Sequence, residues 1–234
     1  MSYNAVEEWS RGSSPLHRRA AAAKLFSLTV FLLVLATAQR RLPLLAGALA
    51  LILIAGFQVA SIPPLAAMWR AAAVLPFTGL FAVMSWMSGN PTHAVELMLK
   101  SYLSALTVLL LVGTTPIPEL LGSLELVKAP RFLLTVVQFL YRYLFLVVDE
   151  AAHMRAAAAA RGGMTFQAAS GALAVLFVRS HSRAEAIHRA MTARGFDGRF
   201  RPLFEHPFGA KDVQFAAVAA GLPLLARVLT DWYR

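Results

Sequence analysis

The chain has 234 residues, of which 58% are hydrophobic and 15% charged, and its mean hydropathy is +0.61. These values exclude an ordinary soluble domain and predict an integral membrane protein, while the absence of cysteine excludes disulfide frameworks and thiolate chemistry. The net charge is +10, but the basic residues lie beside or between the apolar runs, as in cytoplasmic loops of membrane proteins, so we expect no nucleic acid partner.

The first half of the chain reads as a set of membrane spans. Residues 1–24 are polar and basic, and we predict that they stay in the cytoplasm. Residues 25–113 are predicted to form a membrane domain with four spans. The corresponding apolar runs are Leu25–Ala38, Leu42–Ala60, Ala66–Met87 and Leu99–Val112. Four crossings return the chain to the cytoplasm near Thr114.

A cytoplasmic region is predicted over residues 114–211, because twelve Lys or Arg residues there outnumber seven acidic ones. A short amphipathic helix is expected to begin near Pro118 and to end before Pro130. A long helix is predicted from Arg131 to Ala160, lying along the membrane surface or dipping into it. Its apolar part, Phe132–Val148, is long enough to cross the membrane, and its depth is left open.

The last part of the chain contains one more helix and one more span. Ser182 and Glu185 match a capping box, which predicts that a separate helix begins near Ser182, after an apolar segment that ends at Val178. Gly195 is placed to terminate that helix. Residues 212–234 are predicted to form the final transmembrane helix.

Two predicted helices in the basic region end with the same three residues. They are Ala160-Arg161-Gly162 and Ala193-Arg194-Gly195. Each one alone is a common helix ending, because Arg complements the helix dipole and Gly adopts the left-handed conformation that stops a helix. Two of them suggest a common binding role, because small Ala and Gly residues let a helix end enter a groove, where Arg offers a donor fork for carboxylates.

Several segments around these endings resemble one known family. They are Thr114–Leu121, Tyr141-Arg142-Tyr143, Asp149–Arg155 with Ala160–Gly163, and Arg189–Gly198. Their order and composition are similar to the transmembrane T-component of energy-coupling-factor (ECF) transporters, in particular its cobalt-type branch, CbiQ. The resemblance extends from about Lys24 to the C-terminus and is thin in the first four membrane segments.

The resemblance implies a non-catalytic scaffold subunit of an ABC-type importer. The fold would be all-α and polytopic, with five transmembrane helices, or six if Phe132–Val148 also crosses, and a cytoplasmic region of coupling helices. Arg161 and Arg194, with Ala160, Gly162, Ala193 and Gly195 beside them, would dock on ABC-type ATPase subunits. A separate membrane subunit would bind the substrate, expected to be cobalt, with nickel or a vitamin such as biotin as alternatives.

No cofactor or metal is expected on this chain. ATP and Mg would be bound by the partner ATPases, since no glycine-rich phosphate loop of the Walker type occurs in the sequence. In the cobalt branch the metal site resembles a hook at the N-terminus of the partner, whereas this chain begins Met1-Ser2-Tyr3 without a nearby histidine. The resemblance implies a multi-pass protein of the bacterial inner membrane, with the N-terminus and the coupling region in the cytoplasm.

An enzyme is the alternative of another class. Glu150-x-x-His153 and Glu185-x-x-His188 have the spacing found in di-iron carboxylate bundles, with Glu119 or Glu125 as candidate bridging ligands. Arginines crowd the same helices, so salt bridges at helical spacing explain these carboxylates more simply.

Overall fold

In the computed structural model, the described residues are 9, 12–38, 42–126, 129–163, 166–196 and 209–232. Parts of the predicted N-terminal segment 1–24, and Asp197 and Gly198 of the last resembling segment, lie outside them. Over the described ranges all regular structure is helical, which confirms the all-α prediction. The chain divides into two compact units, a bundle unit (residues 1–123 and 204–234) and a hairpin unit (residues 124–203).

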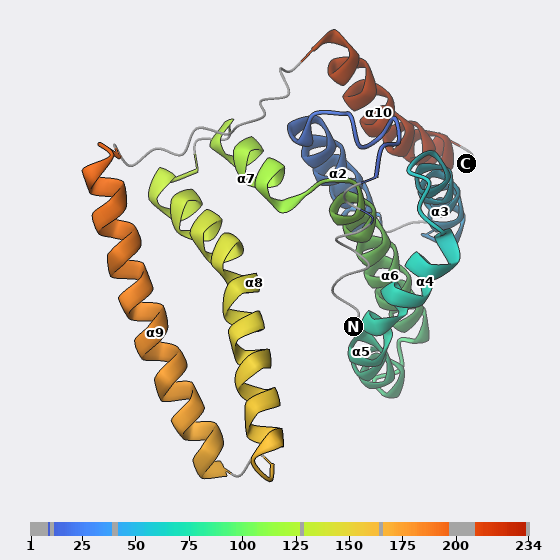
Figure 1. Ribbon diagram of the computed structural model, residues 1–234. Coiled ribbons are helices and arrows are strands. Elements are labelled where there is room, and N and C mark those ends of the chain that lie inside the picture. The colour runs from blue at the N-terminus through green and yellow to red at the C-terminus, as the bar shows by residue number, and fades with distance from the viewer. Residues whose placement is uncertain are drawn as a thin grey trace. The chain divides into compact units, whose positions relative to one another are not determined.

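The bundle unit is built from helices of the first half of the chain and the last helix (Figure 1). These are α2 (Ala21–Ala36), α3 (Leu42–Val59), α4 (Pro64–Ala71), a 3₁₀ turn (Ala72–Val74), α5 (Leu75–Met87), α6 (Pro91–Thr114) and α10 (Ala210–Trp232). Helix α6 packs against α2, α3, α4 and α5, while α10 packs against α2 and α3. The last helix of the chain therefore closes the bundle formed by the first ones.

The core of the bundle unit is made by one face each of α2, α3 and α6. Its largest fully buried hydrophobic side chains are Leu49 and Phe57 on α3, which are joined by Phe31 from α2 and Leu103 from α6. Other faces of the same helices carry exposed apolar residues, of which Leu51 is 69% exposed. A helix that is apolar all round is typical of a membrane-embedded segment.

Five helical stretches of the described chain are long and apolar enough to cross a membrane. They are Leu42–Val59, Pro64–Met87, Pro91–Thr114, Phe132–Ala160 and Ala210–Thr230. The number of candidate spans agrees with the prediction of five or six, but the set differs, because it includes Phe132–Ala160 and lacks α2. Helix α2 has 16 residues and is only about 24 Å long, shorter than the roughly 30 Å hydrocarbon core, whereas Phe132–Ala160 meets the length criterion.

Two of the predicted spans have different boundaries in the structure. The third is interrupted, because α4 and α5 are joined by the 3₁₀ turn just before Pro76. Proline lacks an amide hydrogen and blocks a regular helix through its preceding turn. The fourth begins at Pro91 rather than near Leu99, since Pro is favoured in the first helical turn and the helix continues through the polar residues that follow.

The hairpin unit consists of two long antiparallel helices, α8 (Arg131–Ala160) and α9 (Phe166–Ala193), which lie side by side (Figure 1). Helix α7 (Ile117–Leu126) crosses the boundary between the units and agrees with the predicted short helix. The long helix predicted from Arg131 to Ala160 is confirmed.

The separate helix predicted to begin at Ser182 is wrong. Helix α9 runs without interruption from Phe166 to Ala193, so Ser182 lies in its interior. A capping box requires a residue with non-helical backbone angles at its first position. Between Val178 and Ser182 the sequence has no Gly or Pro to create such a break, and the alanines and arginines that follow favour continuation.

Candidate functional site: two arginine-bearing helix ends

The two Ala-Arg-Gly segments lie at opposite ends of α9. Arg161 follows the last residue of α8, in the turn that joins α8 to α9, and Arg194 follows the last residue of α9. A helix of 28 residues is about 42 Å long, which sets the spacing of the two ends along the hairpin. The structure thus places Arg161 and Arg194 at opposite ends of the same helix, far apart.

The first end, at Arg161, closes with a Schellman motif. The amide of Gly163 donates to the carbonyl of Ala158 (3.1 Å) and the amide of Gly162 to that of Ala159 (3.3 Å). Gly162 has a φ of +103°, a left-handed conformation that residues with a Cβ rarely adopt. Glycine is needed here for its backbone angle, because a Cβ at this position would meet no other atom within 4 Å.

The second end, at Arg194, closes in the same way. The amide of Phe196 donates to the carbonyl of Met191, and the amide of Gly195 to that of Thr192, both at 3.0 Å. Gly195 has a φ of +72°. Both arginines therefore occupy the same position of the same motif, directly before the left-handed glycine, beside carbonyl groups that carry the negative end of the helix dipole.

The surroundings of the two ends differ. At the second end, Phe196 and Met191 line a cavity of about 370 Å³, together with Tyr143 of α8 and the side chain of Arg194. This apolar contact is the usual companion of a Schellman motif. At the first end the equivalent position is Gly163, which has no side chain, so the turn at Arg161 has no such apolar contact. Ala160, Arg161, Ala193 and Arg194 are all exposed, and both arginines are available to a partner.

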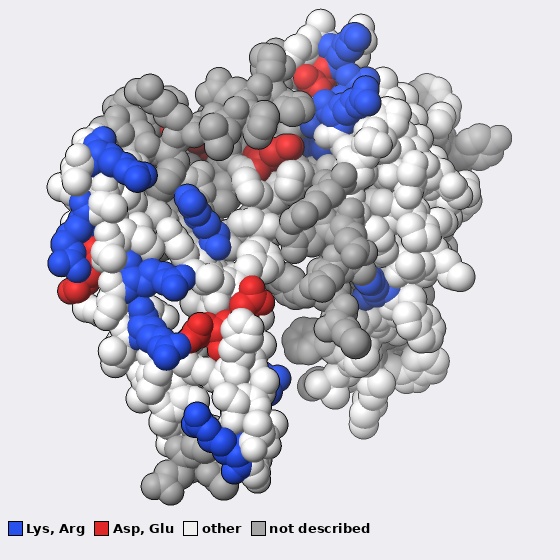
Figure 2. Space-filling model, viewed as in Figure 1, with Lys and Arg blue, Asp and Glu red and all other residues white. Residues whose placement is uncertain are grey.

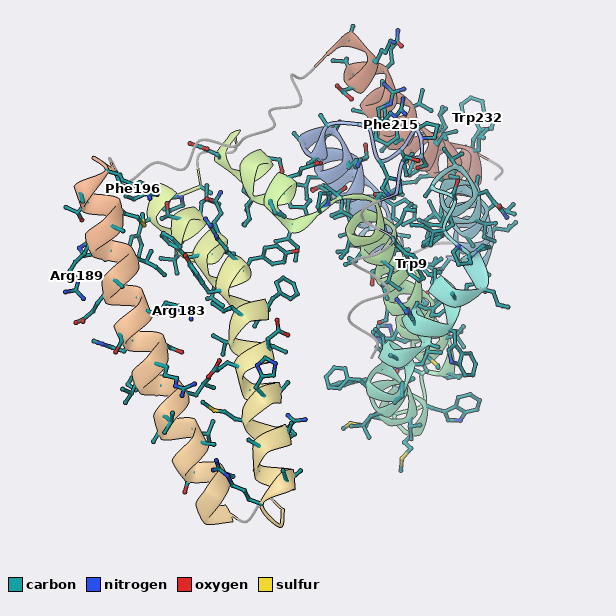
Figure 3. All side chains as sticks on the ribbon, viewed as in Figure 1. Trp9, Arg183, Arg189, Phe196, Phe215 and Trp232 are labelled. Atoms are coloured by element: carbon teal, nitrogen blue, oxygen red, sulfur yellow. The ribbon has the colours of Figure 1, made fainter. Side chains whose placement is uncertain are left out.

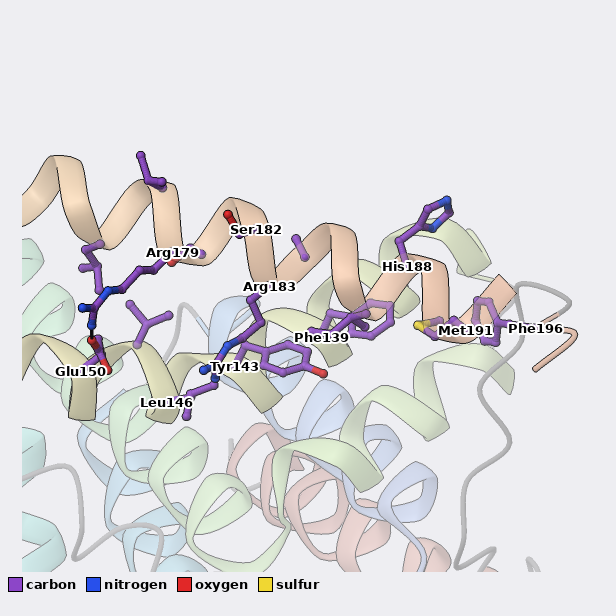
Figure 4. Close-up of a pocket in the computed structure, with 16 residues that line it drawn as sticks. Phe139, Tyr143, Leu146, Glu150, Arg179, Ser182, Arg183, His188, Met191 and Phe196 are labelled. Carbon is purple, nitrogen blue, oxygen red and sulfur yellow. Dashed lines mark hydrogen bonds and ion pairs between the residues drawn. The ribbon is translucent and has the colours of Figure 1, made fainter. Parts of the chain in front are cut away.

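An ion pair between Arg179 of α9 and Glu150 of α8 joins the helices near the middle of the hairpin (Figure 4). In each helix this pair marks a change of character. Helix α8 is apolar before Asp149 and polar after it, whereas α9 is apolar before Arg179 and basic after it. Because the helices are antiparallel, the apolar half of α8 lies beside the basic half of α9.

The apolar half of α8 and the basic half of α9 leave a groove between them. Its volume is about 760 Å³, and its walls include Phe139 and Tyr143 of α8 and Ile187 and Met191 of α9. Figure 4 shows both rings turned toward α9, with Arg183 reaching down beside Tyr143. Figure 2 shows basic side chains spread over the visible face of the hairpin unit. Apolar walls next to these cations suit a position at the membrane surface better than one in water.

The residues of the di-metal alternative are not assembled into a site. Within the described parts of the chain, no group of three or more His, Asp or Glu side chains could hold a metal ion. Glu150 is engaged by Arg179, and Glu185 lies 4.0 Å from His181 on its own helix. The geometry therefore favours ion pairing over the ligand set, although Glu150 pairs across the hairpin and not at the helical spacing expected.

Sequence reasoning identified the two helix ends but missed the contacts between helices. The Glu150–Arg179 pair and the groove depend on the register of the hairpin, which no local pattern reveals. The polar contacts of Lys24 were also missed. Its side chain is only 5% exposed, which is unusual for a lysine.

Comparisons with known proteins agree with this architecture. The family model CbiQ, described as cobalt transport protein, matches residues 12–204. The chain is 27% identical to "Cobalt transport protein CbiQ" of Rhodobacter capsulatus over 180 residues, which are 67% of this chain and 74% of the relative. An uncharacterized protein of Methanocaldococcus jannaschii is 28% identical over 161 residues, 61% of this chain and 60% of that protein. A "Putative fused cobalt transport protein CbiMQ" of Methanocorpusculum labreanum is 32% identical over 90 residues, 36% of this chain and 15% of the relative.

Proposed function

Since the chain belongs to the CbiQ family of cobalt transport proteins, we propose that it is the T-component of an energy-coupling-factor importer. In this role it is a multi-pass membrane subunit without catalytic activity of its own. ABC-type ATPases bind ATP and Mg and dock on its helix ends, while a separate membrane subunit holds the cobalt ion. The chain passes the motion of the ATPases to that subunit.

The observation that carries this proposal is the identical construction of the two helix ends. Arg161 and Arg194 each precede a left-handed glycine in a Schellman motif, and each is exposed. A guanidinium at a narrow helix end suits a groove lined by carboxylates, which it engages through two parallel hydrogen bonds. Two equivalent ends on one hairpin suit two ATPase subunits.

The placement of the hairpin unit follows from the pairing of the apolar half of α8 with the basic half of α9. If α8 crossed the bilayer, the paired half of α9 would carry Arg183, Glu185 and Arg189 into the hydrocarbon region. Each charge there costs several kcal/mol. We therefore place the hairpin at the cytoplasmic surface of the inner membrane, with the apolar half of α8 against the lipid. This agrees with the sequence-based prediction of a surface helix. Four crossings before the hairpin, of which the short apolar helix α2 is the first, put the N-terminus on the same side.

The substrate and the membrane partner are proposed from the relatives. The family description and the name of the R. capsulatus relative both specify cobalt, so cobalt is preferred over nickel or a vitamin such as biotin. The fused relative combines a CbiM and a CbiQ designation in one name, which supports a substrate-binding subunit of the CbiM kind as the membrane partner.

Gentle detergent purification of the tagged chain tests the assembly. We expect ABC-type ATPases and a small membrane subunit to co-purify, and the reconstituted complex to take up radioactive cobalt only when ATP is present. Nickel or biotin at the same concentration as cobalt should not compete with its uptake. A solitary chain that contains stoichiometric iron or manganese would contradict the proposal and favour the enzyme.

Charge reversal at the helix ends tests the docking. Arg161→Glu and Arg194→Glu should each weaken ATPase binding by about 2 to 5 kcal/mol, because each replaces a charge-assisted pair by repulsion. Arg155→Glu and Arg189→Glu are matched controls on the same two helices. Both side chains are exposed and lie before the capped ends, and Figure 3 shows Arg189 projecting away from α8. Unchanged ATPase binding in the Arg161→Glu/Arg194→Glu double variant would end the docking proposal.

A further inference from the structure

Lys24 is buried at the end of α6, where the chain turns into α7 and continues toward the hairpin unit. Its Nζ donates to the carbonyl of Thr114 (2.8 Å), to Oγ1 of Thr115 (3.0 Å) and to the carbonyl of His17 (3.4 Å). Thr114 and Thr115 are themselves 1% and 0% exposed. The ammonium thus fixes the last residue of α6 and the first residue after it.

His17 strengthens the same attachment. Its Nε2 lies 2.7 Å from the carbonyl oxygen of Trp9 and 3.2 Å from that of Gly113, while Nδ1 lies 2.7 Å from Oγ of Ser14. Carbonyl oxygens only accept hydrogen bonds, so Nε2 carries a proton and donates it. Together His17 and Lys24 satisfy two of the carbonyls at the C-terminal end of α6, which otherwise lack partners.

Asp212 holds the returning chain at the same place. Its Oδ1 accepts from the amide of Ala20 (3.1 Å), directly before α2, and its Oδ2 accepts from the amide of Gly209 (3.1 Å), directly before α10. One carboxylate therefore caps its own helix and fastens it to the start of α2. Asp212 is 9% exposed, so these bonds are shielded from water.

The electrostatics of this cluster favour a fixed arrangement. Burial lowers the pKa of Lys24, which precedes the apolar run of α2, from 10.5 to about 8, and the carboxylates of Glu119 and Asp212 act in the opposite direction. A buried ammonium is costly unless it is paired and hydrogen-bonded. Loss of one partner would leave the others buried without compensation.

The chain segments that lead to and from the hairpin unit are thus both held at the start of α2. The outgoing chain passes through Thr114 and Thr115 into α7, and the returning chain reaches α10 through Gly209. We propose that Lys24 and Asp212 form a junction that fastens both connections to α2, so that movement of the hairpin unit is passed to α2 and α10. These are positioning residues, and the inference rests on the proposed coupling function.

Lys24→Met tests the junction in the full complex. The tips at Arg161 and Arg194 are untouched, so ATPases should still co-purify and hydrolyse ATP. Cobalt uptake per ATP hydrolysed should fall about fivefold or more, because charge-assisted hydrogen bonds that transmit the motion are lost. Such uncoupling is not the result of a merely misfolded subunit, which would also lose its ATPases. Lys100→Met is the matched control, since Nζ of Lys100 reaches a carbonyl at the other end of α2 (Ala36, 3.5 Å), and it should keep the wild-type ratio.

A distance measurement gives a second readout. The cysteine-free chain allows spin labels at Phe26→Cys on α2, where the side chain is 58% exposed, and at Gly122→Cys on α7, where a Cβ meets no atom within 4 Å. The distribution should be narrow in the labelled parent and broad with Lys24→Met. Wild-type coupling together with a narrow distribution in Lys24→Met would overturn the junction.

Two further outcomes separate this inference from the proposed function. If the unmodified chain neither binds ATPases nor supports uptake, the proposed function fails, whatever the spin labels show. If Lys24→Met does not accumulate in the membrane, Thr115→Val removes only the 3.0 Å bond and should lower the coupling ratio to a smaller extent. An unchanged ratio in Thr115→Val would then count against the junction.

Discussion

The bundle unit and the hairpin unit contain helices of similar apolar character but bury them very differently. In the bundle unit, apolar side chains of α2, α3 and α6 form a shared core, and Leu49 is completely buried. Among the described residues of α8 and α9, Leu134 is the one hydrophobic side chain that is buried, whereas Phe132 and Phe177 are 76% and 72% exposed. The bundle unit is stabilised by contacts among its own helices, whereas most of the described apolar side chains of the hairpin unit are not buried.

This difference shows how one chain separates stability from binding. The bundle unit has a packed interior, so its helices hold each other in place. The hairpin unit consists of two helices joined along one side, by the Glu150–Arg179 pair and the walls of the groove. Long helices with exposed apolar faces, capped by exposed arginines, are suited to contact lipid and partner subunits.

The largest effect on stability is expected in the core of the bundle unit. Leu49→Ala should lower the free energy of unfolding by about 2 kcal/mol, because it opens a cavity among packed helices. The loss is at the low end of the range for such substitutions, since the hydrophobic effect does not drive helices together in lipid. Leu51→Ala, on the exposed side of the same helix, should change it by less than about 0.5 kcal/mol. Denaturation in mixed detergent micelles measures both. Equal losses would show that the two faces are not distinguished by packing.

A smaller effect is expected at the end of α9. Gly195→Ala should destabilise the helix end by about 1 kcal/mol, because alanine is strained at a φ of +72°. Gly171→Ala, inside the same helix and without a close neighbour, should instead stabilise it by about 0.5 kcal/mol. Hydrogen exchange of the amides near Met191 reports the change. The same sign for both substitutions would contradict the left-handed cap.

The smallest effect is expected at the ion pair of the hairpin. Glu150→Gln removes a pair whose side chains are 35% and 64% exposed, so it should cost less than about 1 kcal/mol. The loss should shrink further at about 1 M salt, where charges are screened within roughly 3 Å. Spin labels on α8 and α9 would report any widening of the hairpin. Glu185→Gln, whose partner is on its own helix, should leave the α8–α9 distance unchanged.

Local patterns were sufficient to predict most helices and both arginine-bearing ends. Pro118 lies in the first turn of α7 and Pro130 follows its end, as expected, and Gly162 and Gly195 stop their helices with the predicted left-handed backbone. Such features depend on a few neighbouring residues. The capping pattern at Ser182 is also local, and it failed because its preference is weak compared with that of the 28 residues which form one continuous helix.

Contacts between distant segments were beyond the reach of sequence patterns. Lys24 was expected to flank a membrane span as a cytoplasmic charge, yet the fold buries it against Thr114 and Thr115, some ninety positions later. Likewise, the spacing of Glu150 and His153 suggested a metal ligand pair until the hairpin placed Arg179 beside the carboxylate. In both cases the partner is chosen by the packing of helices, which a single sequence does not display.

The uninterrupted length of α9 constrains how its two ends can move. In the proposed complex, two ATPases would hold Arg161 and Arg194 at the ends of a helix about 42 Å long, so they could not approach each other along its axis. Closure of the proposed ATPases would instead have to tilt α9 or make it slide. An approach of the two ATPases along a line would thereby become a rotation of α9.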